Sequence, residues 1–394
     1  MCEKFEKVQI KHLPKYLSHL KQLQSLELNF DRPNDLGDST LINLASVLPK
    51  LPLLTQINLS LARYGRMILG STLLEIFSNI RNCSSINLNF EDFNVVNQEA
   101  SDFLVEGLKQ LQAPLVQTLR LHVHKNLSPQ DFISVCQTFT RFTSLNLLHL
   151  SFLESKSLTK HSVVELCLVL SRITTLSSLS LKIPFAAKSI SVIGSLASAI
   201  KSLPNLVHFK LSFESDMESH PDEIPQLFES LKTLTHLQFL DVSFANQKSL
   251  SDDILERFSE SLQKLVQLKH LTLGFGDASP MTAQGVEFLT NAIAKMSDLS
   301  FLDLNFGGIR EIDEETIERI AQTIRHLPLL YSVNLRFIKC FRLRDNERSL
   351  LSLFDALKEM ENIREVFLYI SKGKMNEREV DDLQKRKTVA TYWC

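Results

Sequence analysis

The sequence has little glycine, few cysteines and no long apolar run. Only 11 of the 394 residues are glycine, and none of them belongs to a phosphate-binding loop motif. No stretch of about 18 apolar residues is present, so we predict no membrane-spanning helix. The first residues also lack the apolar core of a signal peptide. These absences argue against the common nucleotide-loop, secreted and transmembrane classes.

The six cysteines are too dispersed to predict a metal site or a disulfide framework. None of them forms a CxxC pair, and the eleven histidines are spread along the chain. The motifs HExxH and GxSxG and an EF-hand calcium loop are absent as well. We therefore predict reduced thiols in a cytoplasmic protein that is not an enzyme. We expect no catalytic residue, no metal, no cofactor and no small-molecule substrate.

Acidic and basic residues nearly balance. The 43 Lys and Arg residues face 45 Asp and Glu residues, for a net charge of −2. That balance favours neither a nucleic acid nor an anionic membrane as a partner. Hydrophobic residues make up 44% and charged residues 22%, which is typical of a folded chain. We therefore expect protein partners, with no nucleic acid and no membrane.

A repeated pattern runs through almost the whole sequence. The segments LKHLTLGF at 268–275 and LSFLDLNF at 299–306 share the pattern LxxLxLxF, and ten further copies occur at a spacing of 29 to 33 residues. The fourth position is apolar in every copy: Leu26, Ile57, Ile86, Leu119, Leu148, Leu179, Phe209, Leu240, Leu271, Leu302, Val333 and Val366. Twelve copies at so regular a spacing indicate a repeat protein.

Each repeat contains two hydrophobic periods. The LxLxF part alternates with period two, which predicts a short strand with one buried face. The preceding segment has the helical period, with Leu255, Phe258 and Leu262 on one side of a helix. Residues that suit the N-cap stand where helices should begin, at Ser128, Ser251 and Asp313. Each repeat is thus predicted to form a helix, a turn and a strand, and stacked repeats would share one core.

The LxxLxLx strand with its helix resembles the leucine-rich-repeat superfamily, and the long repeat resembles the ribonuclease-inhibitor-like subclass. The resemblance implies an α/β solenoid of about 12 repeats that bends into a horseshoe. Parallel strands would line a concave face and helices a convex face, because strands stack more closely than helices. We expect one domain over 1–394, with an N-terminal cap at 1–22, twelve repeats at 23–370 and a C-terminal cap helix at 371–394. A closed (β/α)8 barrel is the alternative, which twelve near-identical units disfavour.

The repeats depart from the family pattern just after the strand. The family places Asn or Cys three residues after the last strand leucine, and these repeats have no such ladder. The preceding residue is phenylalanine in eight of the twelve copies: Phe30, Phe90, Phe152, Phe213, Phe244, Phe275, Phe306 and Phe337. We predict that these rings stack into a spine that holds the turn by packing instead of hydrogen bonds.

The third, fifth and seventh positions of each copy should point away from the helices. On three consecutive repeats the third positions are Phe239, His270 and Phe301, which predicts an aromatic row. Asp241 and Asp303 flank this row. Exposed aromatic side chains are typical of binding hot spots, and we hypothesise that the row docks a basic, apolar segment of a partner protein.

The middle repeats offer a second candidate contact. Arg120, Lys182 and Lys210 occupy outward positions, and no acidic residue stands among these positions. Such a basic patch would suit an acidic segment of a partner. For both candidate contacts, the alternative is a solvated sheet face that binds nothing.

The residues favour a non-catalytic scaffold that binds a protein on its concave face. One alternative is a regulator of an enzyme, either a GTPase-activator-like protein or an inhibitor-like clamp. An activator would need a loop arginine, and the candidates are Arg63, Arg66, Arg310, Arg342 and Arg344. A second alternative is a structural component of a cytoskeletal or ciliary assembly. Repeat stacking determines the fold and leaves the outward positions free to vary, so the sequence leaves all three open.

Overall fold

The computed structural model divides into two compact units, Met1–Ala187 and Lys188–Cys394. Residues 7–30, 38–61, 70–80, 82–90, 98–124, 127–153, 158–183, 192–213, 223–244, 250–276, 281–343, 350–370, 384 and 388–393 are described. The single domain and the horseshoe curvature expected from the sequence stay predictions.

Unit 1 alternates helices with short parallel strands. The strands are β1 (Ser25–Asn29), β2 (Gln56–Ser60), β3 (Ser85–Phe90), β4 (Thr118–His124), β5 (Leu147–Leu153) and β6 (Ser178–Ile183). The helices are α1 (Lys7–Leu17), α2 (Asp38–Ala45), α3 (Gly70–Asn79), α4 (Gln98–Gln110), α5 (Pro129–Thr138) and α6 (Lys160–Leu170), with short 3-10 turns η1 (Leu48–Lys50) and η2 (Phe139–Arg141). The helix α1 lies inside the predicted N-terminal cap.

Unit 2 continues the same alternation. Its strands are β7 (His208–Phe213), β8 (Phe239–Ser243), β9 (His270–Gly274), β10 (Phe301–Asn305), β11 (Ser332–Phe337), β12 (Glu365–Ile370) and β13 (Thr388–Trp393). Its helices are α7 (Val192–Lys201), α8 (Glu223–Leu231), α9 (Asp252–Leu262), α10 (Ala283–Ile293), α11 (Glu314–Arg325) and α12 (Leu351–Glu359), with one 3-10 turn, η3 (Phe341–Leu343).

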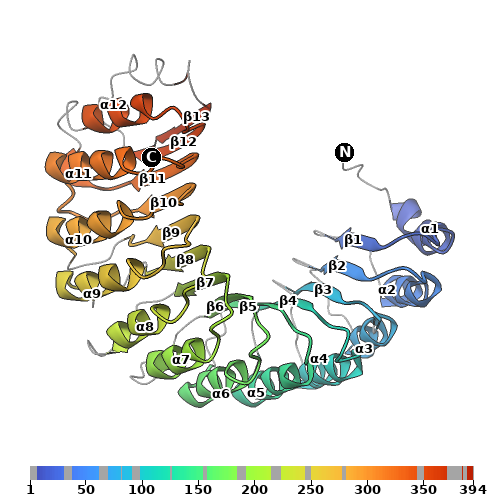
Figure 1. Cartoon of the computed structure of the whole chain (residues 1–394). Helices are drawn as coiled ribbons and strands as arrows, with labels where there is room; N and C mark the ends of the chain where they lie inside the picture. Colours follow the sequence, from blue (N-terminus) through green and yellow to red (C-terminus); the bar gives the residue numbers. More distant parts are fainter. Residues whose placement is uncertain are drawn as a thin grey trace. The chain divides into compact units, whose positions relative to one another are not determined.

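Within each unit, strands that follow one another in the sequence are neighbours in an open parallel sheet. Figure 1 shows that the helices of a unit lie together on one side of its strands. The register matches the repeat position by position, as in the pairing of Leu240 with Leu271 and of Leu271 with Leu302. All twelve predicted strands form where the pattern places them, which confirms the predicted solenoid of about 12 repeats.

The core of each unit lies between its sheet and its helices. The inward strand residues Leu271, Leu273 and Phe275 are fully buried. The helical positions Leu255 and Phe258 are fully buried as well, which confirms the predicted helix face. Burial of one such side chain contributes about 1.5–3 kcal/mol. Because each repeat contacts its neighbours on both sides, this apolar layer runs from repeat to repeat.

The predicted phenylalanine spine is present in unit 2. The rings of Phe244, Phe275, Phe306 and Phe337 are stacked in order, with centroids 6.0, 5.9 and 6.2 Å apart. Backbone hydrogen bonds also link the spine residues to the next repeat. The amide of Phe275 donates to the carbonyl of Asn305 at 2.8 Å, and the amide of Phe306 donates to the carbonyl of Arg336 at 2.9 Å. Phenylalanine packing and backbone pairing thus take the place of a side-chain amide ladder.

The spine is not continuous in unit 1. Leu61 and Val123 interrupt the column, so that Phe90 has no phenylalanine at the same position on either neighbouring strand. Phe152 is fully buried and meets the ring of Phe132 from α5 edge to face at 4.7 Å. The side chain of Phe213, also predicted to join the spine, lies outside the described residues.

Two of the three predicted helix caps form as expected. Ser128 and Asp131 make a reciprocal capping box at the start of α5, and Asp313 accepts from the amide of Thr316 at 3.0 Å. Ser251 precedes α9, but its side chain makes no cap bond. Asp252 beside it instead accepts from the amide and the hydroxyl of Thr282 in the next repeat, at 3.0 and 2.6 Å. The acidic start of α9 therefore links two repeats.

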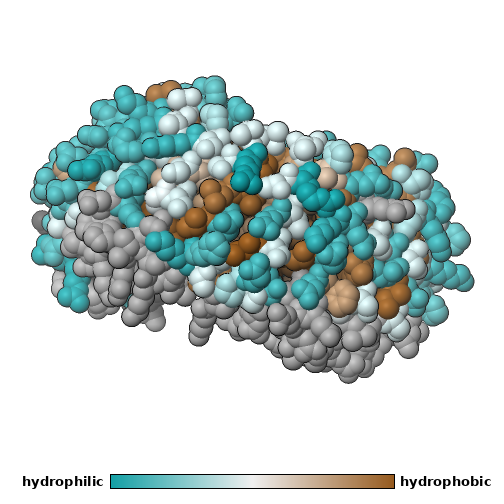
Figure 2. All heavy atoms as spheres, turned by 90° about the horizontal axis from the view of Figure 1, so that it is seen from below, coloured by the Kyte–Doolittle hydropathy of each residue, from teal (hydrophilic) through white to brown (hydrophobic). Residues whose placement is uncertain are grey.

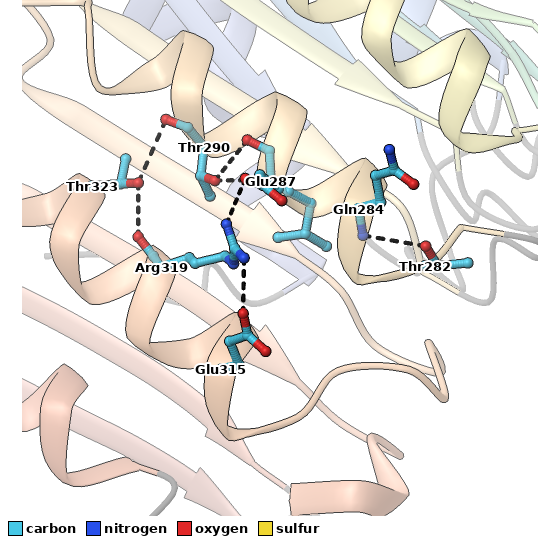
Figure 3. Close-up of polar contacts among 8 residues, drawn as sticks. Thr282, Gln284, Glu287, Thr290, Glu315, Arg319 and Thr323 are labelled. Atoms are coloured by element: carbon cyan, nitrogen blue, oxygen red, sulfur yellow. Dashed lines mark hydrogen bonds and ion pairs between the residues drawn. The ribbon is translucent and has the colours of Figure 1, made fainter.

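Exposed ion pairs and buried threonine hydrogen bonds tie α10 to α11 (Figure 3). Arg319 bridges Glu287 of α10 at 2.6 Å and Glu315 of its own helix at 2.8 Å. The hydroxyl of Thr323 donates to the backbone carbonyls of Thr290 and Arg319. Pairs as exposed as these contribute about 0.2–1 kcal/mol each, so they support a packing that the apolar core determines.

The C-terminal segment differs from the prediction. We expected a cap helix over 371–394, whereas Thr388–Trp393 form the strand β13, which pairs with β12 in register from Glu365 to Ile370. Residues 371–383 lie outside the described part. The strand escaped the sequence pattern because TVATYW lacks the leucines of the repeat. It satisfies the backbone groups along the free side of β12.

Several strongly exposed apolar residues lie in turns. On the face seen from below, hydrophobic residues lie between hydrophilic ones (Figure 2). Turns between a helix and the next strand expose Leu53, Leu115, Val266 and Leu329, with 41–66% of each residue accessible. Isolated exposed apolar residues are normal on protein surfaces.

We predict that the spine couples neighbouring repeats energetically. Phe275→Ala should lower the free energy of unfolding by about 3–5 kcal/mol, because it removes a buried ring that has a stacked neighbour on each side. Phe275→Leu and Phe306→Leu, alone and together, should show a coupling energy of about 0.5–1.5 kcal/mol in urea unfolding. The pair Phe244→Leu and Phe337→Leu, whose rings are separated by two others, is the control and should be additive. Equal coupling in both pairs would contradict a stacked spine.

Candidate functional site

The strand face of unit 2, defined here as the side of β7–β12 away from the helices, presents columns of side chains, and two of these columns contain most of the candidate site. Strand pairing puts His208, Phe239, His270, Phe301, Ser332 and Glu365 in the first column. The second column contains Lys210, Asp241, Thr272, Asp303, Asn334 and Phe367. Consecutive strands lie about 4.8 Å apart, so the members of one column are in contact range.

The predicted aromatic row exists as a continuous stack. Phe239 and His270 have centroids 4.1 Å apart, and His270 and Phe301 have centroids 3.9 Å apart with ring planes 3° from parallel. His208 extends the row by a fourth ring, 5.8 Å from Phe239. The three predicted rings are partly exposed, and His208 is exposed. Because the rings cover one another's faces, the row presents mainly ring edges outward.

His270 is held as a neutral ring between two phenylalanines. Burial lowers the pKa of His270 to about 4, and Lys210 and His208 also lower it, while Asp241 acts in the opposite direction. Its Nε2 lies 3.3 Å from the hydroxyl of Thr272 in the second column. At neutral pH the part of the row from Phe239 to Phe301 is therefore uncharged, which suits an apolar contact.

The two predicted acidic residues have different surroundings. Asp241 forms an ion pair with Lys210, so the charge of this lysine is balanced within the strand face of unit 2. Asp303 is only 7% exposed; it accepts from the side-chain amide of Asn334 at 2.7 Å and from Arg336 at 3.3 Å. Burial raises the pKa of Asp303, and Arg336 opposes this effect. The guanidinium of Arg336 also lies 5.1 Å from the centre of the Tyr369 ring.

The predicted basic residues of unit 1 lie on the strand face of β4–β6. Arg120 on β4 pairs in register with His149, and Lys182 on β6 pairs with Ser151. The rings of His122 on β4 and His149 on β5 have centroids 4.6 Å apart and are tilted by 34° to each other. The structure thus brings Arg120 and Lys182 to the same surface. Lys210 lies in unit 2, and the basic patch as a binding site stays a prediction.

The loop arginines that a GTPase-activator-like mechanism would use are described in part. Arg342 forms an ion pair with Glu311 at 2.7 Å, and Arg310 is exposed. Arg63, Arg66 and Arg344 lie outside the described residues. The structure shows no arrangement around Arg310 that points to a target enzyme.

The described cysteines show the environment of packing residues. Cys83, Cys136, Cys167 and Cys340 are buried thiols, none in a disulfide. Burial raises the pKa of Cys83 to about 11 and that of Cys167 to about 12, so both stay protonated and are poor nucleophiles. Within the described ranges, no group of three His, Cys, Asp or Glu side chains could hold a metal. The described helices include none that is long and apolar enough to cross a membrane.

Several residues of the surface escaped the sequence analysis. His208 was not among the predicted residues of the aromatic row, although its column position would have placed it there. Ser332, Asn334 and Arg336 occupy outward positions that the pattern also identifies. Their importance depends on side-chain contacts and burial, which no spacing rule supplies.

Comparison with known proteins identifies similar folds but no match in sequence. No family model matches the chain, and no curated protein matches it in sequence. A chain of the yeast Rad7 and Elc1 complex is similar in fold, with a TM-score of 0.51 at 18% identity, covering 85% of each chain. The leucine-rich repeat-containing protein LegL7 from Legionella pneumophila has a TM-score of 0.45 at 18% identity, covering 80% of this chain and 93% of that one.

The repeat pattern, the strand and helix alternation and the similar folds show a leucine-rich-repeat type of protein. The likeness extends over most of the chain, so it concerns the whole repeat array and not one motif. The ribonuclease-inhibitor-like subclass stays a prediction.

We predict that His270 makes stability depend on pH. An unfolded histidine takes up a proton near pH 6.5, whereas folded His270 stays neutral down to about pH 4, so folding is penalised as the pH falls between these values. Wild type should lose about 1–2 kcal/mol between pH 7.5 and pH 5 through this residue. His270→Phe keeps a ring in the stack and should abolish that part of the loss in urea unfolding. His236→Phe, at an exposed position, is the control; a profile unchanged by His270→Phe would contradict the assignment.

Proposed function

We propose that this protein is a non-catalytic, cytoplasmic scaffold that binds a partner protein through the strand face of unit 2. The observation that carries the proposal is the stack of Phe239, His270 and Phe301 on three consecutive strands, which His208 extends on the fourth strand with a tilted ring. Aromatic side chains dominate binding hot spots. Because these rings are already fixed against one another, a partner would meet a preorganised surface and lose little side-chain entropy there.

The surroundings of the row support a contact with an apolar segment. The first column is neutral from Phe239 to Phe301, since His270 is uncharged at neutral pH. Charged residues stand in the next column, where Asp241 is matched by Lys210. An apolar centre with a polar border is the usual anatomy of a protein interface. The partner segment would lay apolar side chains along the ring edges and polar groups along the second column.

The comparisons support the proposal at the level of fold. The similar chain of the Rad7 and Elc1 structure comes from a complex of two proteins. A repeat array that presents one regular face is well suited to holding an extended or curved partner. A regulator of an enzyme and a structural component of a fixed assembly would both use the same kind of surface, and the experiment below separates them from a general scaffold.

We predict that the row is needed for partner capture. The double variant Phe239→Ala with Phe301→Ala should fold and should lose, by at least about tenfold, the partner that wild type captures from a lysate of the source cells, as quantified by mass spectrometry. The matched control is Val266→Ala with Leu329→Ala, which removes two exposed apolar side chains in turns of the same unit. The control should retain the partner.

The outcomes discriminate between the readings. A partner kept by the double variant would place the contact elsewhere and contradict the proposed site. A partner that is an enzyme whose turnover changes on binding would favour the regulator. Recovery of the chain mainly with insoluble cell structures would favour the structural component.

We further propose that Arg120 and Lys182 in unit 1 contact an acidic segment. Such contacts are screened by salt, so affinity for the captured partner should fall between about 50 and 200 mM NaCl. Arg120→Gln with Lys182→Gln should flatten that dependence, as measured by titration of purified partner at each salt concentration. An unchanged salt dependence in this variant would contradict the basic contact.

A further inference from the structure

Unsatisfied hydrogen-bonding groups are concentrated at one point of the strand face. Among the described residues, four buried side-chain oxygens lack a hydrogen-bond partner: Asn87 Oδ1, Asp303 Oδ1, Ser332 Oγ and Asn334 Oδ1. The last three, named here the acceptor cluster, lie on the adjacent strands β10 and β11. Buried polar groups are nearly always paired in native proteins, so three unpaired oxygens together require an explanation.

The fold brings the acceptor cluster to the end of the aromatic row. Ser332 is the register partner of Phe301, the last ring of the row, and Asn334 is the register partner of Asp303. The three residues are only 3–9% exposed. The other oxygen of Asp303 already accepts from Asn334 and Arg336, so each member of the cluster is held by its strand or by a neighbour while one oxygen stays unpaired.

The chemistry of the cluster calls for a donor. A carboxylate oxygen and an amide oxygen only accept, and the serine hydroxyl can accept as well. The local charge points the same way. Asp241 forms an ion pair with Lys210, and Asp303 forms one with Arg336. Glu365 on β12 is the register partner of Ser332 and forms no ion pair with any described residue. One negative charge is thus in excess beside the cluster.

We propose that the acceptor cluster binds the ammonium group of a lysine side chain presented by the partner protein. This inference rests on the proposed scaffold function and specifies its partner. A lysine ammonium supplies three N–H donors on a thin apolar stem, so its donors equal the cluster's acceptors in number. Its stem would lie against Phe301, where the apolar row ends. The docked segment would therefore carry apolar residues followed by a lysine.

Entry of the lysine requires a small rearrangement. The three oxygens are covered in the free protein, so a neighbouring side chain must turn aside. Arg336, whose side chain is 34% exposed, and the partly exposed Glu365 border the cluster and are long and flexible enough to do so. Both would stay close to the bound ammonium, Glu365 as its counter-charge.

A peptide selection on the full chain supplies the probe. Peptides from a random displayed library would be selected on wild type, and the tightest binder would be synthesised with its lysine intact, replaced by norleucine, or replaced by arginine. Affinity would be measured by fluorescence anisotropy. We expect lysine to be enriched at one position, norleucine to weaken binding by about 10- to 100-fold, since it removes only the ammonium, and arginine to bind at least about fivefold more weakly than lysine.

Ser332→Ala provides a second test with two opposite readouts. Removal of an unpaired buried hydroxyl should raise the melting temperature of the free protein, because the desolvated group is gone. The same change should lower the affinity for the lysine peptide by about fivefold or more and leave the affinity for the norleucine peptide unchanged. Ser243→Ala, at a partly exposed position on β8, is the matched control and should change neither quantity.

Each failure has a distinct meaning. A selection without lysine enrichment, a norleucine peptide that binds as well as the lysine peptide, or a Ser332→Ala variant that binds both peptides like wild type would overturn the ammonium site. If the selected peptides still bind the variant with Phe239→Ala and Phe301→Ala more weakly than they bind wild type, the scaffold function stands and only the lysine assignment fails. If they bind that variant unchanged, the proposed docking site fails as well.

Discussion

The structure depends on the apolar layer that each strand and helix shares with the repeats beside it. A single repeat of about 31 residues is too small to enclose its own leucines, so burial requires a neighbour in matching position. Leu240, Leu271 and Leu302 are each fully buried and in register. A slip of one residue would turn these side chains to solvent, so the packing itself imposes the one-to-one register.

That register converts a linear repeat into columns of side chains. On the inward side, the column after the strand becomes the spine from Phe244 to Phe337. On the outward side, the same pairing produces the stack from Phe239 to Phe301. Backbone pairing sets the strand spacing at which the outward rings can stack. The candidate binding surface is therefore a consequence of how the core is packed.

The sequence predicted what depends on periodicity and missed what depends on individual side-chain contacts. The twelve strands, the helix face of Leu255 and Phe258, and the stacking of Phe239, His270 and Phe301 all follow from the repeat spacing. The strand β13 was missed because its residues lack leucines. Ser251 was expected to cap α9, and Asp252 makes the inter-repeat bond instead. The burial of Ser332 depends on the conformations of the long side chains around it, and the repeat spacing does not determine these conformations.

The spine also determines how cooperatively neighbouring repeats should unfold. Where stacked rings link one repeat to the next, as from Phe244 to Phe337, opening one turn breaks contacts in both neighbours. Where Leu61 and Val123 interrupt the column, a repeat can loosen with less effect on the next one. Backbone amides of β8–β11 should then exchange with solvent as one cooperative block, and those of β1–β4 strand by strand. The aromatic row should thus lie on a block of strands that opens as one unit and is less given to local fluctuation than β1–β4.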